Sequence, residues 1–188
     1  EMCIRDRCAV VGSIERKRKE QSAPKLYDLT TLQREANRYY DFTASQTLKI
    51  VQELYEEKLV TYPRTDSQYI TEDMQQTMAD LLKHYGGEAD GVKQVVNNKK
   101  VTDHHAILTT LESCKRGSNS LSEDKEKVFA LIVWKMQQAV QPPYIYEDVL
   151  VTVCCQDRKF TAKYKNVLQA GHTAMPVPFA EQEKSKDM

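Results

Sequence analysis

The spacing of apolar residues divides the chain into a helical middle and a strand-like end. Between about residues 30 and 139, apolar positions recur at intervals of three and four, which is typical of amphipathic helices. Pro142-Pro143 marks the clearest change of composition, and after it valine occupies every second position from 149 to 153. Phe160, Ala162 and Tyr164 alternate in the same way after a short polar break. The change of spacing predicts a β-hairpin beyond the prolines.

Start and stop residues locate the helices of the middle region. Two pairs, Thr30 with Gln33 and Thr43 with Gln46, have the spacing of a capping box, in which each residue bonds the backbone of the other. Caps and stops of this kind place helices at about residues 30–40, 44–58, 72–85 and 122–139. The first two form a unit of helix-turn-helix character. The apolar stripe of the second helix includes Tyr55, which we expect to pack in the core.

Formal charge is balanced, because the 188 residues include 27 basic and 27 acidic side chains. Without a general positive field, any affinity for nucleic acid has to come from local patches. The run from Arg16 to Lys19 and the loop from Asn97 to Lys100 are such patches. Each is either solvated sequence or a contact for DNA phosphates.

The cysteine pattern favours a reducing, cytoplasmic location. Five cysteines include no C-x-x-C pair and leave an odd count, which indicates neither a zinc ribbon nor a disulfide framework. The longest early apolar run, residues 8–11, is too short for a signal peptide or a membrane span. The chain starts at Glu1 and its first residues have no periodicity, so we expect it to be part of a longer protein.

The residues with the clearest chemical potential follow a short β-favouring run, Leu59 to Thr61. Tyr62 ends the run, Pro63 stops it, and Arg64 follows at once. A phenolate can attack phosphorus while a guanidinium binds phosphate oxygens in a bidentate manner. An ordinary tyrosine has a pKa of about 10 and needs help to ionise at neutral pH. The alternative is a strand end with an aromatic core residue and a solvated arginine.

A second polar group, Asp103-His104-His105, is open to three interpretations. It is a polar helix start, a metal site or a phosphate-binding group. Adjacent histidines on a helix point about 100° apart, and no third ligand lies nearby in the sequence, which disfavours a metal site.

These two segments closely resemble the conserved motifs of one enzyme family. The string TYPRTDS (61–67) resembles the active-site motif of type IA DNA topoisomerases, in the topoisomerase III-like branch, and DHHAILTT (103–110) resembles the family's DHHAI segment. The sequence that leads to Tyr62 is similar as well, so the resemblance covers about residues 26–111. Thr109 departs from the family, which often has proline there.

The resemblance implies reversible cleavage of one DNA strand, with Tyr62 as the nucleophile and a 5′-phosphotyrosine as the intermediate. It implies that Arg64 stabilises the phosphoryl oxygens and that His104 binds the phosphate near the cleaved bond, with Asp103 orienting a ring nitrogen. The remaining candidates are residues expected to contact DNA: Thr65, Ser67, Asp103, His105 and Arg34.

The family's Mg²⁺ ligands belong to an acidic cluster in another domain, and no such cluster occurs in this sequence. The resemblance therefore implies a central segment without its own metal site, whose partners are DNA and the remaining domains of the enzyme. We expect it to be inactive alone.

The implied fold is α+β and mainly α, with a helical tyrosine domain flanked by β segments of the enzyme's arch. The expected boundaries are 1–28 for the first β segment, 29–140 for the helical domain and 141–188 for the returning β segment. The first alternative is a non-catalytic helix-turn-helix DNA-binding module. The second is a tyrosine recombinase, which would form a 3′-phosphotyrosine and needs several dispersed arginines.

Overall fold

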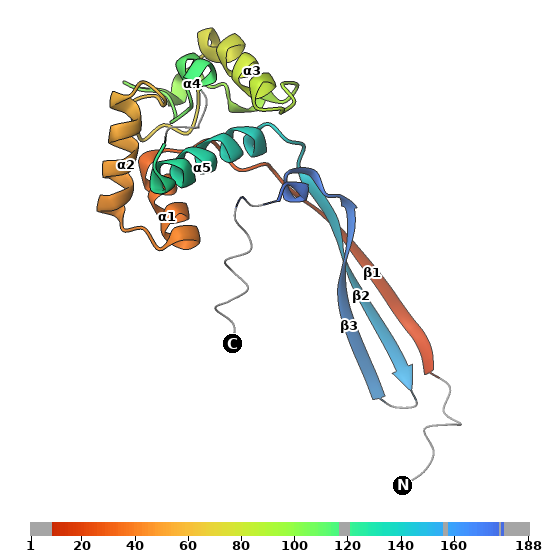
Figure 1. Cartoon of the computed structure of the whole chain (residues 1–188). Helices are drawn as coiled ribbons and strands as arrows, with labels where there is room; N and C mark the ends of the chain where they lie inside the picture. Colours follow the sequence, from red (N-terminus) through yellow and green to blue (C-terminus); the bar gives the residue numbers. More distant parts are fainter. Residues whose placement is uncertain (1–8, 117–120, 156–157, 177, 179–188) are drawn as a thin grey trace.

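The computed structural model describes residues 9–116, 121–155, 158–176 and 178. It contains a helical unit and a long three-stranded antiparallel sheet that extends from one side of it (Figure 1). The strand order is β1-β2-β3, so the first strand of the chain pairs with a strand that follows all the α-helices. The strands are β1 (Ala9–Gln21), β2 (Tyr144–Cys155) and β3 (Arg158–Gln169). The helical unit is therefore inserted between two hydrogen-bonded strands.

The first two helices each begin with a capping box. In α1 (Leu29–Tyr40) the cap is Asp28, whose carboxylate accepts a hydrogen bond from the Thr31 amide at 2.6 Å. The helix thus begins within one residue of the predicted start near Thr30, but its capping box is formed by Asp28 and Thr31 and not by Thr30 and Gln33. In α2 (Ala44–Glu56) the predicted pair of Thr43 and Gln46 forms the cap.

The rest of the helical unit mixes α-helices with short 3₁₀ turns. The elements are η1 (Glu72–Met74), α3 (Gln75–His84), η2 (Val92–Val95), η3 (Asn98–Lys100), α4 (Leu111–Arg116), α5 (Glu123–Ala139) and η4 (Gly171–Ala174). Gly86 has a φ of 75°, so the expected glycine stop follows α3. Residues 103–110 contain no helix, which excludes the interpretation of the Asp-His-His group as a helix start.

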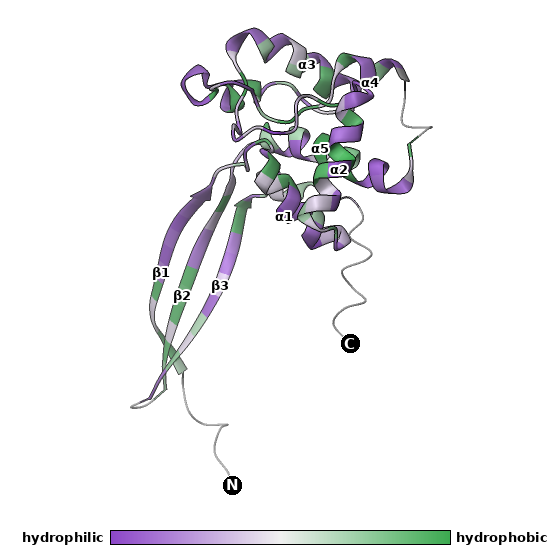
Figure 2. Cartoon of the chain, turned by 90° about the vertical axis from the view of Figure 1, so that its left-hand side faces the viewer, coloured by the Kyte–Doolittle hydropathy of each residue, from purple (hydrophilic) through white to green (hydrophobic). Residues whose placement is uncertain are grey.

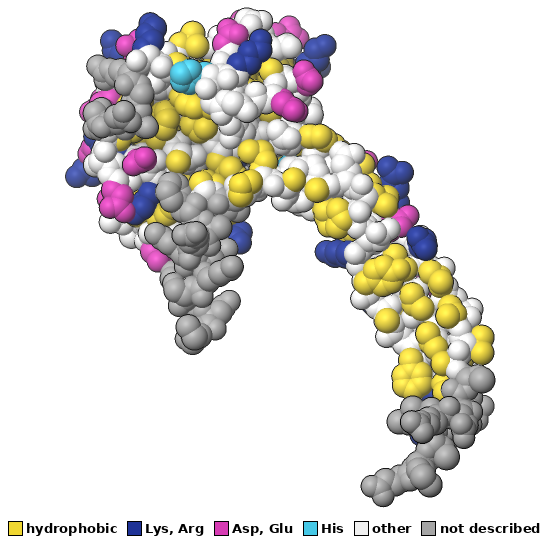
Figure 3. All heavy atoms as spheres, turned by 45° about the vertical axis from the view of Figure 1, so that its right-hand side comes forward, with side chains coloured by type: hydrophobic (Ala, Val, Ile, Leu, Met, Phe, Trp, Pro, Cys, Tyr) yellow, Lys and Arg dark blue, Asp and Glu magenta, His cyan; other side chains and the backbone are white. Residues whose placement is uncertain are grey.

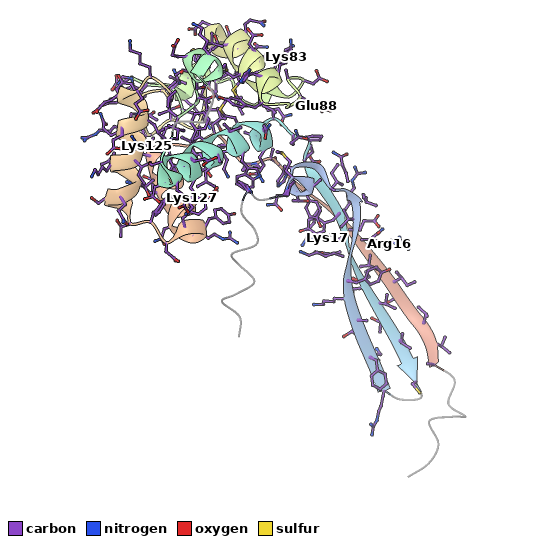
Figure 4. All side chains as sticks on the ribbon, viewed as in Figure 1. Arg16, Lys17, Lys83, Glu88, Lys125 and Lys127 are labelled. Carbon is purple, nitrogen blue, oxygen red and sulfur yellow. The ribbon has the colours of Figure 1, made fainter. Side chains whose placement is uncertain are left out.

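Helix α5 is the central support of the helical unit. Eight of its side chains are buried, and the seven apolar ones among them share one core with side chains from α1, α2 and α3. Lys125 also ties it to α2 through the carboxylates of Glu53 and Glu57, at 2.9 and 2.7 Å (Figure 4). Figure 2, coloured by hydropathy, shows hydrophobic and hydrophilic stretches alternating along these helices.

A buried polar network joins α5 to α1. Lys135 is 4% exposed, and its ammonium group lies 2.8 Å from the Glu35 carboxylate. The hydroxyl of Tyr27 donates to the same carboxylate. Burial, reinforced by the neighbouring Glu35, strongly raises the pKa of Tyr27, so its phenol stays neutral. The network fixes the segment that precedes α1 against the last helix.

The sheet confirms the predicted hairpin and adds β1 to it. Residues paired across the strands share a face, so Ile14, Val151 and Ala162 lie on one side. Figure 3 shows hydrophobic side chains along the face of the sheet in view. Phe160 and Tyr164, which share a face of β3 with Ala162, are more than half exposed. The basic run predicted as a patch lies on β1, where Arg16 and Lys19 pair with Glu147 and Asp148 of β2.

The fold thus contains the expected combination of helices and antiparallel strands. The helix-turn-helix character of α1 and α2, the predominance of helix and the three domain boundaries stay predictions. The first residues of the expected 1–28 segment and most residues after 176 lie outside the described part of the chain. Within that part, no helix is long and apolar enough to cross a membrane.

Close packing at the end of α5 gives a stability test. A Cβ added at Gly91 would lie 1.8 Å from the carbonyl oxygen of Val140. We therefore expect Gly91→Ala to lower the free energy of unfolding by about 3 kcal/mol. Gly86→Ala is the matched control, since its Cβ would meet open space and only the positive φ would cost about 1 kcal/mol. Urea denaturation measures both, and equal losses would contradict the packing described.

Candidate active site

Backbone hydrogen bonds bring the tyrosine segment and the histidine segment together. Val60 forms an isolated antiparallel bridge with Thr109, and the Thr61 amide donates to the Leu108 carbonyl at 2.9 Å. The Thr61 hydroxyl donates to the Ala106 carbonyl at 3.2 Å and accepts from the Leu108 amide at 3.0 Å. One threonine side chain thus holds the two segments in register. The β-favouring run that ends at Thr61 forms this isolated bridge and not a longer strand.

Further bonds extend this frame on both sides of the tyrosine. The Thr65 hydroxyl donates to the carbonyl of His104 at 3.0 Å. The Ala106 amide donates to the carbonyl of Tyr69, at 2.9 Å, and the Ile107 amide to that of Tyr27, at 2.8 Å. Each bond joins residues far apart in the sequence, so the site depends on the tertiary fold.

The ring of Tyr62 lies between two aromatic neighbours. Its centroid is 4.4 Å from that of the His104 ring, with the planes tilted by 45°. The second neighbour is Tyr55, whose ring centroid lies 5.5 Å from that of Tyr62 in an edge-to-face arrangement. Tyr55 is 38% exposed, so the prediction that it packs in the core is wrong. It projects from the last turn of α2 and limits the positions that the Tyr62 ring can take.

A polar cleft of about 510 Å³ adjoins the tyrosine. Its walls come from the start of α1, from the segment after Tyr62 and from the residues before Ala106. They are formed by Asp28, Leu29, Thr30, Leu48, Arg64, Thr65, Asp66, Thr102, Asp103 and His104. Arg64 and His104 are exposed, so both can meet a ligand in the cleft. A guanidinium, an imidazole and the positive end of a helix are groups that bind phosphate.

The structure gathers most of the predicted site residues at this cleft. Arg64, Asp103 and His104 line it, and Tyr62 reaches it through its ring contact with His104. No hydrogen bond joins Asp103 to His104 among the described residues, so the proposed orienting role of Asp103 lacks a direct contact here. His105 is half-buried, and its Nδ1 donates to the carbonyl of Ala106 at 2.8 Å.

The side chains of Thr65 and Ser67 are buried and have internal hydrogen-bond partners. Their predicted contacts with DNA stay predictions. Thr65 bonds His104, and the Ser67 hydroxyl donates to the Lys100 carbonyl at 2.9 Å. Arg34 is exposed but lines a different, smaller cavity beside the start of α1. In the described part of the chain, no three His, Cys, Asp or Glu side chains form a group that could hold a metal ion.

Sequence reasoning missed one cluster of charged and aromatic residues. Lys25 and Lys100 both place their ammonium groups 5.1 Å from the centroid of the Tyr69 ring. Lys100 had been noted as part of a basic loop, but Lys25 and Tyr69 lie 44 positions apart and have no shared pattern in the sequence. Their association is visible only in the fold.

Comparisons with known proteins agree on one family. A family model described as DNA topoisomerase matches residues 1–188. The DNA topoisomerase 3 proteins of Bacillus licheniformis and Bacillus subtilis are each 37% identical over 193 aligned residues, which cover 95% of this chain and 26% of theirs. The chain thus spans about a quarter of the length of these curated relatives.

A solved structure shows a similar fold. It is that of full-length topoisomerase I from Thermotoga maritima, with a TM-score of 0.69 and 23% sequence identity. The match covers 91% of this chain and 31% of the Thermotoga protein. The helical unit and the sheet therefore occur together in a much longer chain.

The double role of the Thr61 hydroxyl generates a prediction about the frame of the site. Thr61→Val keeps the shape but leaves the buried Leu108 amide and the Ala106 carbonyl without this partner, which we expect to cost about 2 kcal/mol. Thr61→Ser keeps the hydroxyl and serves as the control. Urea denaturation and hydrogen exchange at the Leu108 amide measure the effect. If the valine variant is as stable and as well protected as the serine variant, the hydroxyl does not hold the segments together.

Proposed function

The chain belongs to the type IA DNA topoisomerase family, and we propose that it contains that family's strand-cleavage site, with Tyr62 as the nucleophile. The observation that carries this proposal is the contact between Tyr62 and His104 beside the cleft that Arg64 lines. A phenol, a cation and an imidazole thus lie at one open surface, where a flexible single strand of DNA can lie.

The proposed reaction exchanges one ester bond for another. The Tyr62 oxygen loses its proton and attacks the phosphorus of a DNA phosphodiester, and the bond from phosphorus to the 3′-oxygen breaks. The departing 3′-oxygen takes up a proton, which leaves a 3′-hydroxyl and a 5′-phosphotyrosine. Religation is the reverse reaction. Because an ester is formed for each ester broken, the exchange needs no external energy source.

Arg64 and His104 have complementary tasks in this proposal. The planar guanidinium of Arg64 can bind two phosphoryl oxygens at once as negative charge develops on them. The imidazole of His104, packed on the Tyr62 ring, would bind the same phosphate. Both side chains are exposed at the cleft, so neither needs to move out of the core to reach DNA.

The whole reaction cycle requires more than these residues. The chain spans about a quarter of its curated relatives, and passage of a second strand needs a protein gate that opens and closes. As the resemblance to the family implies, the Mg²⁺ ligands of the enzyme would belong to a domain outside this segment. We therefore expect the 188 residues alone not to relax supercoiled DNA. Separately, the cysteine pattern favours a cytoplasmic location.

The alternative of a helix-turn-helix module that binds DNA without cleaving it receives no support from the comparisons. It would use α1 and α2 and leave Tyr62 without a role. A recombinase would attach Tyr62 to the opposite end of the broken strand. The presence of a covalent DNA adduct and its polarity separate these alternatives.

Loss of a single oxygen tests the nucleophile. In a full-length enzyme that contains these residues, Tyr62→Phe should abolish cleavage and leave DNA affinity within about threefold, since the ring and its contacts remain. Tyr164→Phe on β3 is the matched control and should cleave normally. Relaxation of supercoiled DNA by the Tyr62 variant at the normal rate would remove this residue from the mechanism.

The roles of the cleft residues are tested by geometry and charge. Arg64→Lys keeps the charge but loses the two-pronged guanidinium, so we expect cleavage to fall on the order of 10-fold. His104→Ala should lose on the order of 10²-fold. Arg38→Lys, which changes an arginine that lies over Tyr39, is the control. Single-turnover cleavage of a labelled oligonucleotide measures all three, and full activity in both cleft variants would refute these roles.

A further inference from the structure

Two lysines from separate segments converge on one phenol close to the cleft. Lys25 lies in the connection between β1 and α1, and Lys100 ends η3. The ammonium group of each lies 5.1 Å from the centroid of the Tyr69 ring. A hydrogen bond with Lys25, with a further contribution from Lys100, lowers the pKa of the Tyr69 phenol despite its partial burial. The three groups therefore interact directly.

This cluster carries positive charge, and no ion pair within the described part of the chain neutralises it. Among the ion pairs formed by the described residues, none includes Lys25 or Lys100, although other lysines such as Lys19 and Lys125 are paired. Both lysines are exposed, so a ligand in solvent can reach them. Bringing two like charges together costs free energy that an anion between them would recover.

The cluster is attached to the same frame as Tyr62. The Ser67 hydroxyl donates to the carbonyl of Lys100, and the carbonyl of Tyr69 accepts from the Ala106 amide in the histidine segment. Lys25 lies two residues before Tyr27, which bridges Ile107. These bonds hold the cluster at a fixed position relative to the tyrosine segment.

The space beside Lys25 also adjoins the cleft. A cavity of about 280 Å³ is lined by Lys25, Arg34 and Gln68, among others. The Gln68 amide donates to the Asp28 carboxylate at 3.0 Å, and Asp28 is itself a wall of the cleft. The cavity beside Lys25 and the cleft are therefore neighbours, separated by the contact between Gln68 and Asp28.

We propose that Lys25, Lys100 and Tyr69 form a second phosphate-binding site, which holds a phosphodiester of the cleaved strand outside the bond that Tyr62 attacks. The lysines supply charge, and the Tyr69 hydroxyl donates a hydrogen bond to a phosphate oxygen. The identification of the ligand as a DNA strand rests on the proposed function, whereas the phosphate chemistry rests on the cluster itself. The site would keep the strand in place when the scissile bond is open.

The test is the salt dependence of binding of a short fluorescein-labelled oligothymidylate to the purified chain. Lys25→Gln and Lys100→Gln should each weaken binding roughly three- to tenfold at low salt and reduce the slope of log K against log salt by about 0.7. Lys93→Gln removes the same charge from an exposed position on η2 and should change affinity less than about twofold. Lys25→Arg keeps the charge and should bind as tightly as the unaltered chain. Tyr69→Phe removes the hydroxyl and should weaken binding.

The outcomes distinguish this proposal from the proposed function. If Lys25→Gln and Lys100→Gln behave like Lys93→Gln, or if the unaltered chain does not bind the oligonucleotide at low salt, the second phosphate site is refuted while Tyr62 keeps its role. If the two variants lose affinity as expected but no DNA adduct forms on Tyr62 in a full-length enzyme, the site stands and the cleavage proposal fails. Circular dichroism of each variant verifies that the fold is unchanged.

Discussion

The hydrogen bonds between the tyrosine segment and the histidine segment are the constraint on which the rest of the site depends. Thr61 and Thr65 use their hydroxyls to bond the carbonyls of Ala106 and His104, more than thirty residues away in the chain. The two segments do not form a regular sheet: they share the isolated bridge of Val60 to Thr109, and the side-chain hydrogen bonds supply the remaining connections. The arrangement leaves the rings of Tyr62 and His104 in contact at the surface.

The larger architecture explains how these short segments stay in register. Strands β1 and β2 pair along most of their length, and their pairing brings the two ends of the helical unit together. Inside the unit, α5 packs against the early helices, and its buried Lys135 pairs with the half-buried Glu35 of α1. Glu35 also accepts a hydrogen bond from Tyr27, which holds the segment before α1. Loss of the Glu35 carboxylate would leave the buried Lys135 charge without this partner, so the contact opposes separation of α1 from α5. The site thus rests on a packed helical unit, while the long sheet extends away from it.

Much of this could be predicted from the sequence, because it depends on local chemistry. Helix positions followed from apolar spacing and capping residues, and the hairpin from alternation. The cap of α1 was misidentified, because the Asp28 carboxylate and not Thr30 accepts the backbone hydrogen bond at the start of the helix. Tyr55 was assigned to the core from helical spacing alone, but the partner that holds it is Tyr62, which lies outside the helix. The apolar spacing of a helix does not show which of its side chains packs against a neighbouring loop and which enters the core.

The candidate site shows the same division between local and tertiary information. The motif around Tyr62 and the Asp-His-His group were recognisable as strings, and their residues meet at one cleft. The internal bonds of Thr65 and Ser67, and the approach of Lys25 to Tyr69, depend on contacts between segments distant in the sequence. No spacing rule predicts such contacts, because the fold alone sets the distance between those segments.

The central claim is that Tyr62 forms the covalent link to DNA. The most direct measurement traps the cleaved complex of a full-length enzyme with a strand labelled at each end in turn, and then maps the modified peptide by mass spectrometry. The account predicts an adduct on the peptide that contains Tyr62, linked through the 5′-phosphate, with a free 3′-hydroxyl on the other fragment. An adduct on another tyrosine such as Tyr69, or a link to the 3′-phosphate, would contradict it.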